Sequence, residues 1–334
     1  MIVKYEPFTE IVLFGGTPLM PRLAKRLREH YRVTMYTAPR QVADVPEVEG
    51  TERIITSDIN QELVPAATSA LGIGLGEAWR FGPRLRTAFG QRLIDFMSIP
   101  YPEYLGGAHV THAILRGERY WGASMQLVTE NTIQGEVHDG PVIYGIPLSF
   151  PMEDEHYQLE RRYYDFIVDF ITKANDGYEF KPGVTTYRHG PKSFFPRLNT
   201  ERQGWVDFDW RRIHVIRFIK GFDAPYPGAR TLVHDGQQSR MVTLHDVIDV
   251  GVASYHPFQS GLILDEVDTI KGKRATVALR DGAIAVTIRD DLGHLPAWLK
   301  PGMRLHTDRG TLDHAMTYCP QYTASGDTAM KVMT

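Results

Sequence analysis

Strand-like and helix-like segments alternate through the first half of the chain, and this alternation limits the fold more than any other feature. Residues 10–16 read as a buried strand that closes in a glycine turn, and a helix with leucines on one face begins near Pro18. Further strands are expected at residues 32–36, 71–76, 92–96, 122–128 and 141–144, and further helices at 63–70 and 155–174. This alternation predicts an α/β fold, with a doubly wound, mostly parallel sheet covered by helices on both faces.

The helix expected at residues 155–174 has the clearest pattern in the chain. Apolar and aromatic side chains recur at spacings of three and four residues: Leu159, Tyr163, Phe166, Ile167, Phe170 and Ile171. Such a stripe is typical of a helix face that packs in a core or an interface. We therefore expect packing here rather than a ligand site.

The alternation of strands and helices stops near residue 175. Residues 175–204 contain prolines, glycines and charges without periodicity, which is typical of a linker on the surface. From Arg230 onward, short strands alternate with turns such as His234–Gly236 and Arg280–Gly282, so a smaller C-terminal β-barrel-like domain is expected. The predicted organisation is an α/β domain over 1–175, a linker over 176–204, a β-rich domain over 205–318 and a tail over 319–334.

Composition limits the class of partner. The 334 residues are 43% hydrophobic with a net charge of −3, so large cores can form, and neither nucleic acid nor an anionic membrane is favoured as a partner. A small soluble molecule is the better expectation. The single cysteine, Cys319, excludes an intramolecular disulfide and a multi-cysteine metal site and fits a reducing compartment, the cytoplasm. No apolar run has the length of a membrane span, and the first ten residues show no export signal.

Residues 93–115 indicate where a functional cleft lies. An apolar strand leads into a proline-rich loop, and Gly106 and Gly107 then open a helix. In α/β folds a strand end, the loop after it and the free N–H groups of a helix start meet at one place, where ligands bind. The candidate site therefore lies around Asp95, Met97 and the start of this helix.

Two segments resemble hallmarks of the folate-dependent formyltransferases, which include the methionyl-tRNA formyltransferases and the sugar N-formyltransferases. In the first, Pro102, Tyr104, Gly106 and residues 113–115 fall in register with the family's active-site loop and helix. The second, residues 205–228, is similar to the family's Ile-Asp-Trp motif, the helix after it and an Asp-x-Pro-x-Pro-Gly-Ala turn. The resemblance covers roughly residues 10–305 and implies the family's α/β fold with a C-terminal barrel.

The resemblance implies transfer of a formyl or related one-carbon or acyl group from 10-formyltetrahydrofolate to an amine. In the family an Asn and a His polarise the formyl oxygen, and an Asp in a glycine-containing loop moves protons. Here Asp95 stands at the Asn position and Met97 at the His position. Two alternatives stay open for the position of the family's Asp. It falls on Ile133 when this chain is aligned with the family motif without a gap, and on Asp139 when the alignment contains a gap.

Three side chains are candidates to replace this catalytic set: Asp95, His109 and Asp139. A carboxylate in a cleft can act as a general base when desolvation raises its pKa, although Asp95 could instead hydrogen-bond the following loop. His109 stands at a helix start, where the dipole favours neutral imidazole, or it is an ordinary helix-entry histidine. His112 is expected to pack against the sheet. No spacing typical of a metal site occurs, so no metal is expected.

The family binds the pterin largely through backbone groups of two loops, which correspond to residues 77–85 and 128–134. The implied folate-binding residues are Trp79, Arg80, Phe81, Leu85, Met97, Thr129 and Ile133. Trp79 and Phe81 could flank a flat heterocycle, although aromatic residues beside a loop are more often ordinary packing. Residues 37–60 hold more acids than bases, unlike the basic loop of the tRNA enzymes, which favours a small amine over tRNA as acceptor.

Two classes of function remain open from the sequence. One is a formyltransferase-like enzyme that acts on a small biosynthetic amine through a non-standard active site. The other is a noncatalytic or repurposed protein of the same fold, either a ligand-binding pseudoenzyme or a catalyst of different chemistry in the same cleft. The identity of the amine, the binding of folate and the oligomeric state, a homodimer included, are left open.

Overall fold

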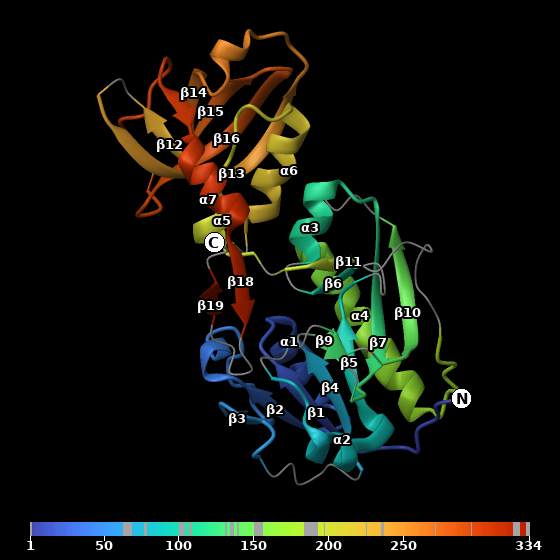
Figure 1. Ribbon diagram of the computed structural model, residues 1–334. Coiled ribbons are helices and arrows are strands. Elements are labelled where there is room, and N and C mark those ends of the chain that lie inside the picture. Colours follow the sequence, from blue (N-terminus) through green and yellow to red (C-terminus); the bar gives the residue numbers. More distant parts are fainter. Residues whose placement is uncertain are drawn as a thin grey trace.

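The first half of the chain folds around a seven-stranded sheet with the strand order β10-β7-β5-β4-β1-β2-β3 (Figure 1). The computed structural model describes residues 2–62, 69–76, 79–99, 104–106, 109–130, 132–133, 137–138, 140–149, 156–183, 193–196, 198–224, 226–234, 237–270, 272–294, 296–322 and 328–331. The strands are β1 (Glu10–Gly15), β2 (Arg32–Thr37), β3 (Glu52–Ile55), β4 (Leu71–Leu75), β5 (Leu93–Met97), β7 (Tyr120–Leu127) and β10 (Val142–Ser149). Strands β1 to β5 pair in parallel, whereas β7 pairs antiparallel with both of its neighbours, β5 and β10. The mostly parallel sheet predicted from the sequence is confirmed.

Helices cover both faces of this sheet, as a doubly wound fold requires. Alternate residues of β1 belong to different cores: Ile11 and Leu13 pack with α1 (Leu19–Leu27) and α4 (His156–Asn175), whereas Val12 and Phe14 pack with α2 (Pro83–Phe89). From Tyr163 to Ile171 the expected stripe of α4 is buried in the first of these cores, so its interpretation as packing is confirmed there, and the side chain of Leu159 lies outside the described residues. Most of the helix expected at 63–70 falls outside the described residues.

The chain between β5 and β7 contains a short strand that the sequence did not predict. Strand β6 (Tyr104–Gly106) precedes α3 (His109–Arg116) and pairs in parallel with β11 (Ser193–Phe195). Both β11 and α5 (Thr200–Gln203) lie in the predicted linker, and Phe180 of the same segment forms a bridge with Val3. The predicted linker thus contains secondary structure. The two-residue strands β8 (Thr132–Ile133) and β9 (Val137–His138) form a separate pair. The exact domain boundaries stay a prediction.

The second half forms an antiparallel sheet that closes on itself. Its order is β14-β15-β16-β13-β12-β17. The strands are β12 (Ala229–His234), β13 (Ser239–Gly251), β14 (Ile263–Thr269), β15 (Gly272–Leu279), β16 (Gly282–Asp290) and β17 (Arg304–His306). Ile263 N donates to Met303 O at 2.9 Å and Leu305 N donates to Gly261 O at 2.8 Å, which joins the two ends of the sheet. The expected barrel-like architecture is therefore present.

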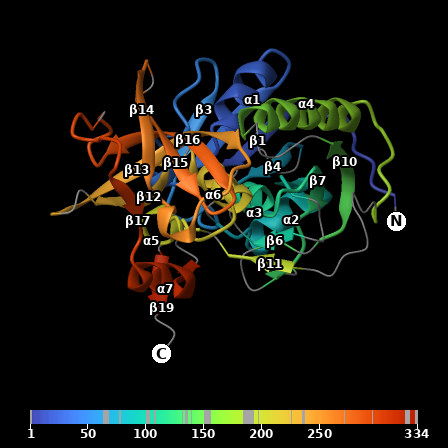
Figure 2. The ribbon, with the colours of Figure 1, turned by 90° about the horizontal axis from the view of Figure 1, so that it is seen from above.

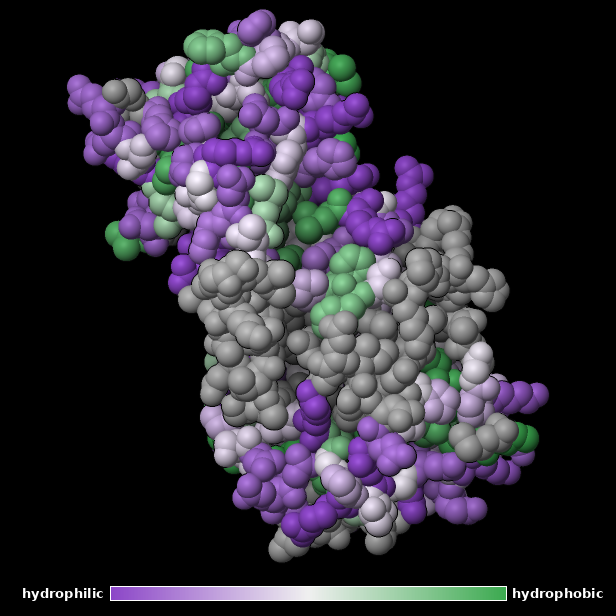
Figure 3. Space-filling model, viewed as in Figure 1, coloured by the Kyte–Doolittle hydropathy of each residue, from purple (hydrophilic) through white to green (hydrophobic). Residues whose placement is uncertain are grey.

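Helix α6 (Arg212–Phe222) fills the barrel's core with Val215, Ile216, Ile219 and Phe222. The predicted Arg280–Gly282 turn joins β15 to β16, where Leu279 pairs with Gly282. A short helix, η4 (Pro257–Gln259), lies between β13 and β14. After β17 come α7 (Arg309–Thr317) and a hairpin of β18 (Cys319–Tyr322) and β19 (Thr328–Lys331). Figure 3 shows a largely hydrophilic surface over the barrel part and some hydrophobic side chains where it meets the sheet part.

Candidate active site

The carboxyl ends of β1, β2 and β4 meet through their loops. A Cβ atom on Gly15 would lie 2.2 Å from Leu75 O, and Gly15 has φ +154°, so only glycine allows the β1 turn to press onto the end of β4. Gln41, which follows β2, donates from Nε2 to Gly76 O at 3.1 Å. The three loops therefore form one edge of the sheet, the edge at which ligands bind in this class of fold.

Asp95 lies near this edge, two residues before the end of β5. It is only 5% exposed and its Cα partners are Gly74 on β4 and Gln126 on β7. Residues that are paired across strands point to the same face of a sheet, and Gly74 has no side chain to fill the space beside the carboxyl group. Met97 is also buried, and it pairs with Ser124 of β7.

Two further polar side chains share this face, and the sequence analysis did not single them out. Ser124 and Gln126 are both fully buried. Gln126 donates from Nε2 to Gly140 O at 2.6 Å, which fixes the orientation of its amide. Among the described residues neither Gln126 Oε1 nor Ser124 Oγ has a hydrogen-bond partner. Two polar residues on the same side of an otherwise apolar buried strand were the signal that could have revealed them.

The arrangement at this face favours a group that donates hydrogen bonds. Gln126 Oε1 can only accept, a carboxylate at Asp95 accepts, and the hydroxyl of Ser124 can do either. Of these three residues, Gln126 and Ser124 have a buried polar atom without a partner among the described residues, whereas Asp95 already takes part in an interaction. A buried polar atom without a partner is costly and calls for a ligand, an ion or water. An amine or another N–H group of a ligand is chemically suited to this place.

The aromatic candidates for folate binding lie in the core beside α2. Trp79 is buried and donates from Nε1 to Ser57 O at 3.2 Å, and the Phe81 ring centroid is 5.2 Å from that of Phe14. Leu85 is buried in the same core, whereas Arg80 is exposed and its carbonyl accepts from Asn60. Val128 also belongs to this core, so the two loops expected to bind the pterin lie close to each other.

The remaining candidates are placed only in part. Thr129 is partly exposed, and its carbonyl accepts from Arg86 Nη1 at 3.3 Å. His109 is the first residue of α3 and Ile133 ends β8, but their side chains lie outside the described residues, as does the whole of Asp139. The choice between Ile133 and Asp139 therefore stays open, and the roles of all these residues stay predictions.

His112 lies outside the site. Its ring packs against Phe195 of β11 at a centroid distance of 4.8 Å, and its Nε2 is 3.1 Å from Pro196 O. Burial lowers the pKa of His112, although the contact with that carbonyl opposes the shift, and a neutral imidazole donates to the carbonyl through Nε2–H. Its expected packing role thus involves the short strand β11.

In the part of the chain that the structure describes, no group of three or more His, Cys, Asp or Glu side chains is arranged to hold a metal ion. Within the same described residues, no helix combines the length and the apolar composition that crossing a membrane requires.

Comparison with curated proteins identifies a related sequence. No family model matches the chain. A methionyl-tRNA formyltransferase from Pseudothermotoga lettingae is 26% identical over 190 residues, which are 56% of this chain and 56% of that protein. The chain thus spans little more than half the length of the curated relative that it matches.

Solved structures share the fold. A variant of HypX from Aquifex aeolicus superposes with a TM-score of 0.60 at 17% identity, covering 85% of this chain and 45% of HypX. HypX in complex with tetrahydrofolic acid has a TM-score of 0.58 at 17% identity, with 93% and 52% covered. A 4-N formyltransferase from Francisella tularensis has a TM-score of 0.51 at 12% identity, with 71% and 97% covered. Over part of its length the chain is thus similar in sequence to a methionyl-tRNA formyltransferase, and it shares the fold of these solved structures, in agreement with the two motifs.

Proposed function

We propose that the protein transfers a formyl or related one-carbon group from a folate donor to a small-molecule amine, through an active site that lacks the family's usual residues. The observation that carries this proposal is the buried Asp95, which lies beside Gly74 and in register with Gln126 at the ligand-binding edge of the sheet. A buried carboxylate at such an edge, next to acceptors without partners, is typical of a functional site rather than of a core.

Bound 10-formyltetrahydrofolate would supply the formyl group. The residues that would hold it are those of the loops around Phe81 and Thr129, which carry backbone groups beside the α2 core. The chemistry of the nearby groups fits such a donor, because the pterin and the amine both offer N–H groups to Gln126 Oε1 and Ser124 Oγ. HypX, which shares the fold, has been crystallised with tetrahydrofolic acid, and this supports the assignment of a folate ligand.

In this proposal each residue has a limited task. Asp95 would accept the proton that the amine loses as its nitrogen bonds to the formyl carbon, and would return this proton to N10 of the folate as the bond between the formyl carbon and N10 breaks, so that tetrahydrofolate leaves. Gln126 and Ser124 orient the amine through hydrogen bonds, and the free N–H groups at the start of α3 stabilise negative charge on the formyl oxygen. Met97 has no proton to transfer and is a poor acceptor, so it only fills space.

Titration of tetrahydrofolate into the purified protein is the experiment that tests the proposal. We expect saturable binding, and consumption of 10-formyltetrahydrofolate that depends on an added amine. A panel of amino sugars and amino acids would be used, because the acceptor's identity is unknown. Absence of folate binding, with an intact fold by circular dichroism, would reject the proposal.

A second candidate is a ligand-binding protein without catalysis. The observation in its favour is Met97, a buried methionine where the family has its catalytic His. Saturable folate binding without turnover on any amine would support this candidate. A small amine as acceptor, a homodimer and a cytoplasmic location are further parts of this proposal. The purified protein can test the first two.

A further inference from the structure

Helix α3, which begins at the candidate His109, packs against α6 of the barrel part (Figures 1 and 2). The other side of α3 contributes Ala113 and Ile114 to the core of the sheet part. This helix therefore lies between the two halves of the molecule. Its position depends on both of them.

One contact in this interface joins Thr111 of α3 to Gly221 of α6. Thr111 is 2% exposed, and its Oγ1 donates a buried hydrogen bond of 3.1 Å to Gly221 O. A Cβ atom on Gly221 would lie 3.2 Å from Thr111 Cγ2, so a larger residue would press against α3. Thr111 is only two residues from His109, and a shift of this first turn would therefore move the histidine as well.

A second contact holds the other end of α3. Gly117, just after the helix, has φ +67°, and a Cβ atom there would lie 2.1 Å from Arg217 Cζ. Thr111, near the start of α3, contacts α6 near the C-terminal end of α6. Gly117, just after the end of α3, contacts α6 one turn closer to the N-terminus of α6. The two helices therefore run antiparallel. Contacts at both ends fix the angle and the register of α3 relative to α6.

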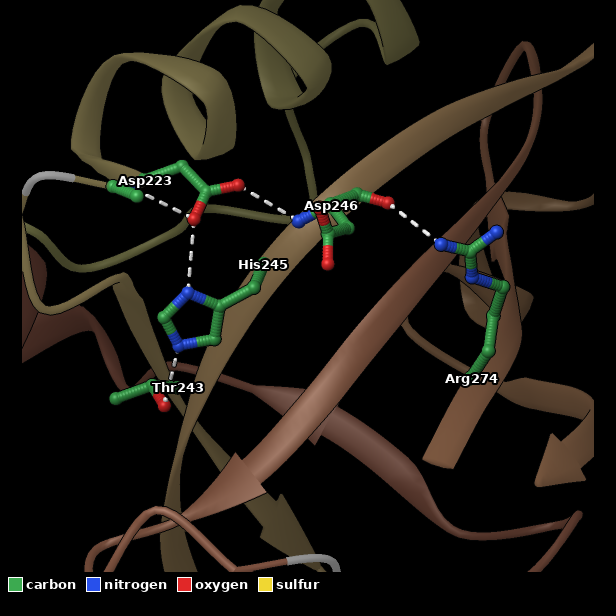
Figure 4. A network of polar contacts seen from close by, with 6 residues as sticks. Asp223, Thr243, His245, Asp246 and Arg274 are labelled. Carbon is green, nitrogen blue, oxygen red and sulfur yellow. Dashed lines mark hydrogen bonds and ion pairs between the residues drawn. The ribbon is translucent and has the colours of Figure 1, made fainter. Parts of the chain in front are cut away.

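Helix α6 is in turn anchored to the barrel wall through Asp223, which follows its last residue (Figure 4). The Asp223 carboxylate accepts from His245 Nδ1 at 2.9 Å and from Asp246 N at 2.7 Å. Both partners belong to β13. A continuous set of contacts thus connects the barrel wall to the first turn of α3.

We propose that Thr111 and Gly221 are positioning residues, through which the barrel part sets the place of α3 and of the N–H groups at its start, with His109, the first residue of the helix, as the reporter of that place. The catalytic consequence of this proposal rests on the proposed formyl transfer. The structural part, that His109 changes its surroundings when the contact is lost, does not depend on that function.

The test compares Thr111→Val with Thr111→Ser. Valine has the shape of threonine without the hydroxyl, whereas serine keeps the hydrogen bond to Gly221. Protein labelled with carbon-13 in the histidine rings reports on His109, whose signal is assigned with His109→Gln. We expect the His109 signal to move in Thr111→Val and to stay in place in Thr111→Ser. With folate donor and an active amine, kcat should fall about tenfold in Thr111→Val with a smaller change in KM, because misplacement mainly affects the reacting geometry.

Thr231→Val is the matched control. Thr231 is fully buried in the barrel, and its hydroxyl is 3.3 Å from that of Thr307, so the substitution also removes a buried hydroxyl. It should leave the His109 signal unchanged. If Thr111→Val yields too little folded protein, Gly221→Ala is the second variant. An unchanged His109 signal, or the same change in Thr231→Val, would overturn the proposal. Absence of turnover in the wild type would instead count against the proposed function, and the His109 comparison would still decide this inference.

Discussion

A half-buried polar region in the barrel part and a buried polar region in the sheet part differ in how their hydrogen bonds are satisfied. In the barrel part, the Asp223 carboxylate accepts three hydrogen bonds, and both nitrogens of His245 have partners, since Nε2 is 3.0 Å from Thr243 Oγ1 (Figure 4). In the sheet part, Ser124 Oγ and Gln126 Oε1 are buried beside Asp95 without partners among the described residues. The first region is complete as it stands. The second is suited to receive a ligand.

The completeness of the Asp223 region argues for a structural role there. Thr243, His245 and Asp223 are connected in the order of a nucleophile, a base and an orienting acid, which is the pattern of hydrolytic triads. The His245 ring, however, lies against Gly228, in the turn that leads from α6 into β12. We interpret the network as the anchor of this turn. The comparison teaches that connectivity alone does not mark a catalytic site.

Restoring the family's residues should have the largest effect in the sheet region. The triple variant Met97→His, Asp95→Asn and Ile133→Asp removes the proposed base, and we expect its formyl transfer to fall on the order of a hundredfold below the wild type. Turnover of 10-formyltetrahydrofolate with an amine panel measures this. Met97→Leu is the control and should change the rate less than threefold or so, because a volume-conserving change disturbs packing little. A rise in rate in the triple variant would mean that the protein is a decayed enzyme of the usual type.

In the barrel region the largest effect should be on stability. Asp223→Ala leaves His245 Nδ1 and Asp246 N without an acceptor, and we expect the free energy of unfolding to fall by on the order of 2–4 kcal/mol. Urea denaturation followed by fluorescence measures the change. Asp313→Ala is the control, since its ion pair with Arg309 is exposed, and it should cost less than about 0.5 kcal/mol. Equal losses in both variants would contradict the structural interpretation.

The alternation of strands and helices made the sheet part predictable from the sequence. The leucines of α1 and the aromatic stripe of α4 follow helical spacing, which is a local signal, and both helices occur where they were expected. The pairing of β6 with β11 joins residues far apart in the chain, and no local pattern reveals such a pair. The alternation of short strands and turns after Arg230 predicted a barrel-like domain, but no local pattern reveals that the sheet closes between Ile263 and Met303.

The candidate site was predictable in its location but not in its composition. Asp95 and Met97 were found because they stand at positions of a motif, and the structure places both in β5. Ser124 and Gln126 belong to no such motif. Their significance depends on burial and on missing hydrogen-bond partners, which only the folded chain shows. The catalytic and folate-binding roles stay predictions.

Ser124→Ala should have a smaller effect. It should stabilise the fold and weaken the binding of the amine. Because the Ser124 hydroxyl is buried without a partner among the described residues, its removal should raise the free energy of unfolding by up to about 1 kcal/mol. The same change should weaken binding of the amine, measured as a higher KM. Thr231→Ala, which removes a buried hydroxyl that has a partner, should destabilise the protein instead. A loss of stability in Ser124→Ala would show that its hydroxyl is already satisfied.

The smallest expected effect is a pH dependence of the barrel's stability. Burial alone would raise the pKa of Asp223, but hydrogen bonds from His245, Asp246 N and Ala224 N hold this pKa below its ordinary value. A lowered pKa in the folded state stabilises the fold above the unfolded value of about 4, and this contribution is lost as pH falls further. Urea denaturation between pH 7 and pH 3 should therefore show a steeper loss in the wild type than in Asp223→Asn. Parallel curves would contradict the lowered pKa.

The central claim is that Asp95 serves as the base of a formyl-transfer site at the edge of the sheet. Its most direct test is the rate of amine-dependent 10-formyltetrahydrofolate consumption by wild type and Asp95→Asn side by side, with Asp313→Asn as a control for a carboxylate far from this edge. We predict that Asp95→Asn lowers the rate about a hundredfold or more while tetrahydrofolate still binds, since a lost general base commonly has an effect of this size. Equal rates for wild type and Asp95→Asn would contradict the account.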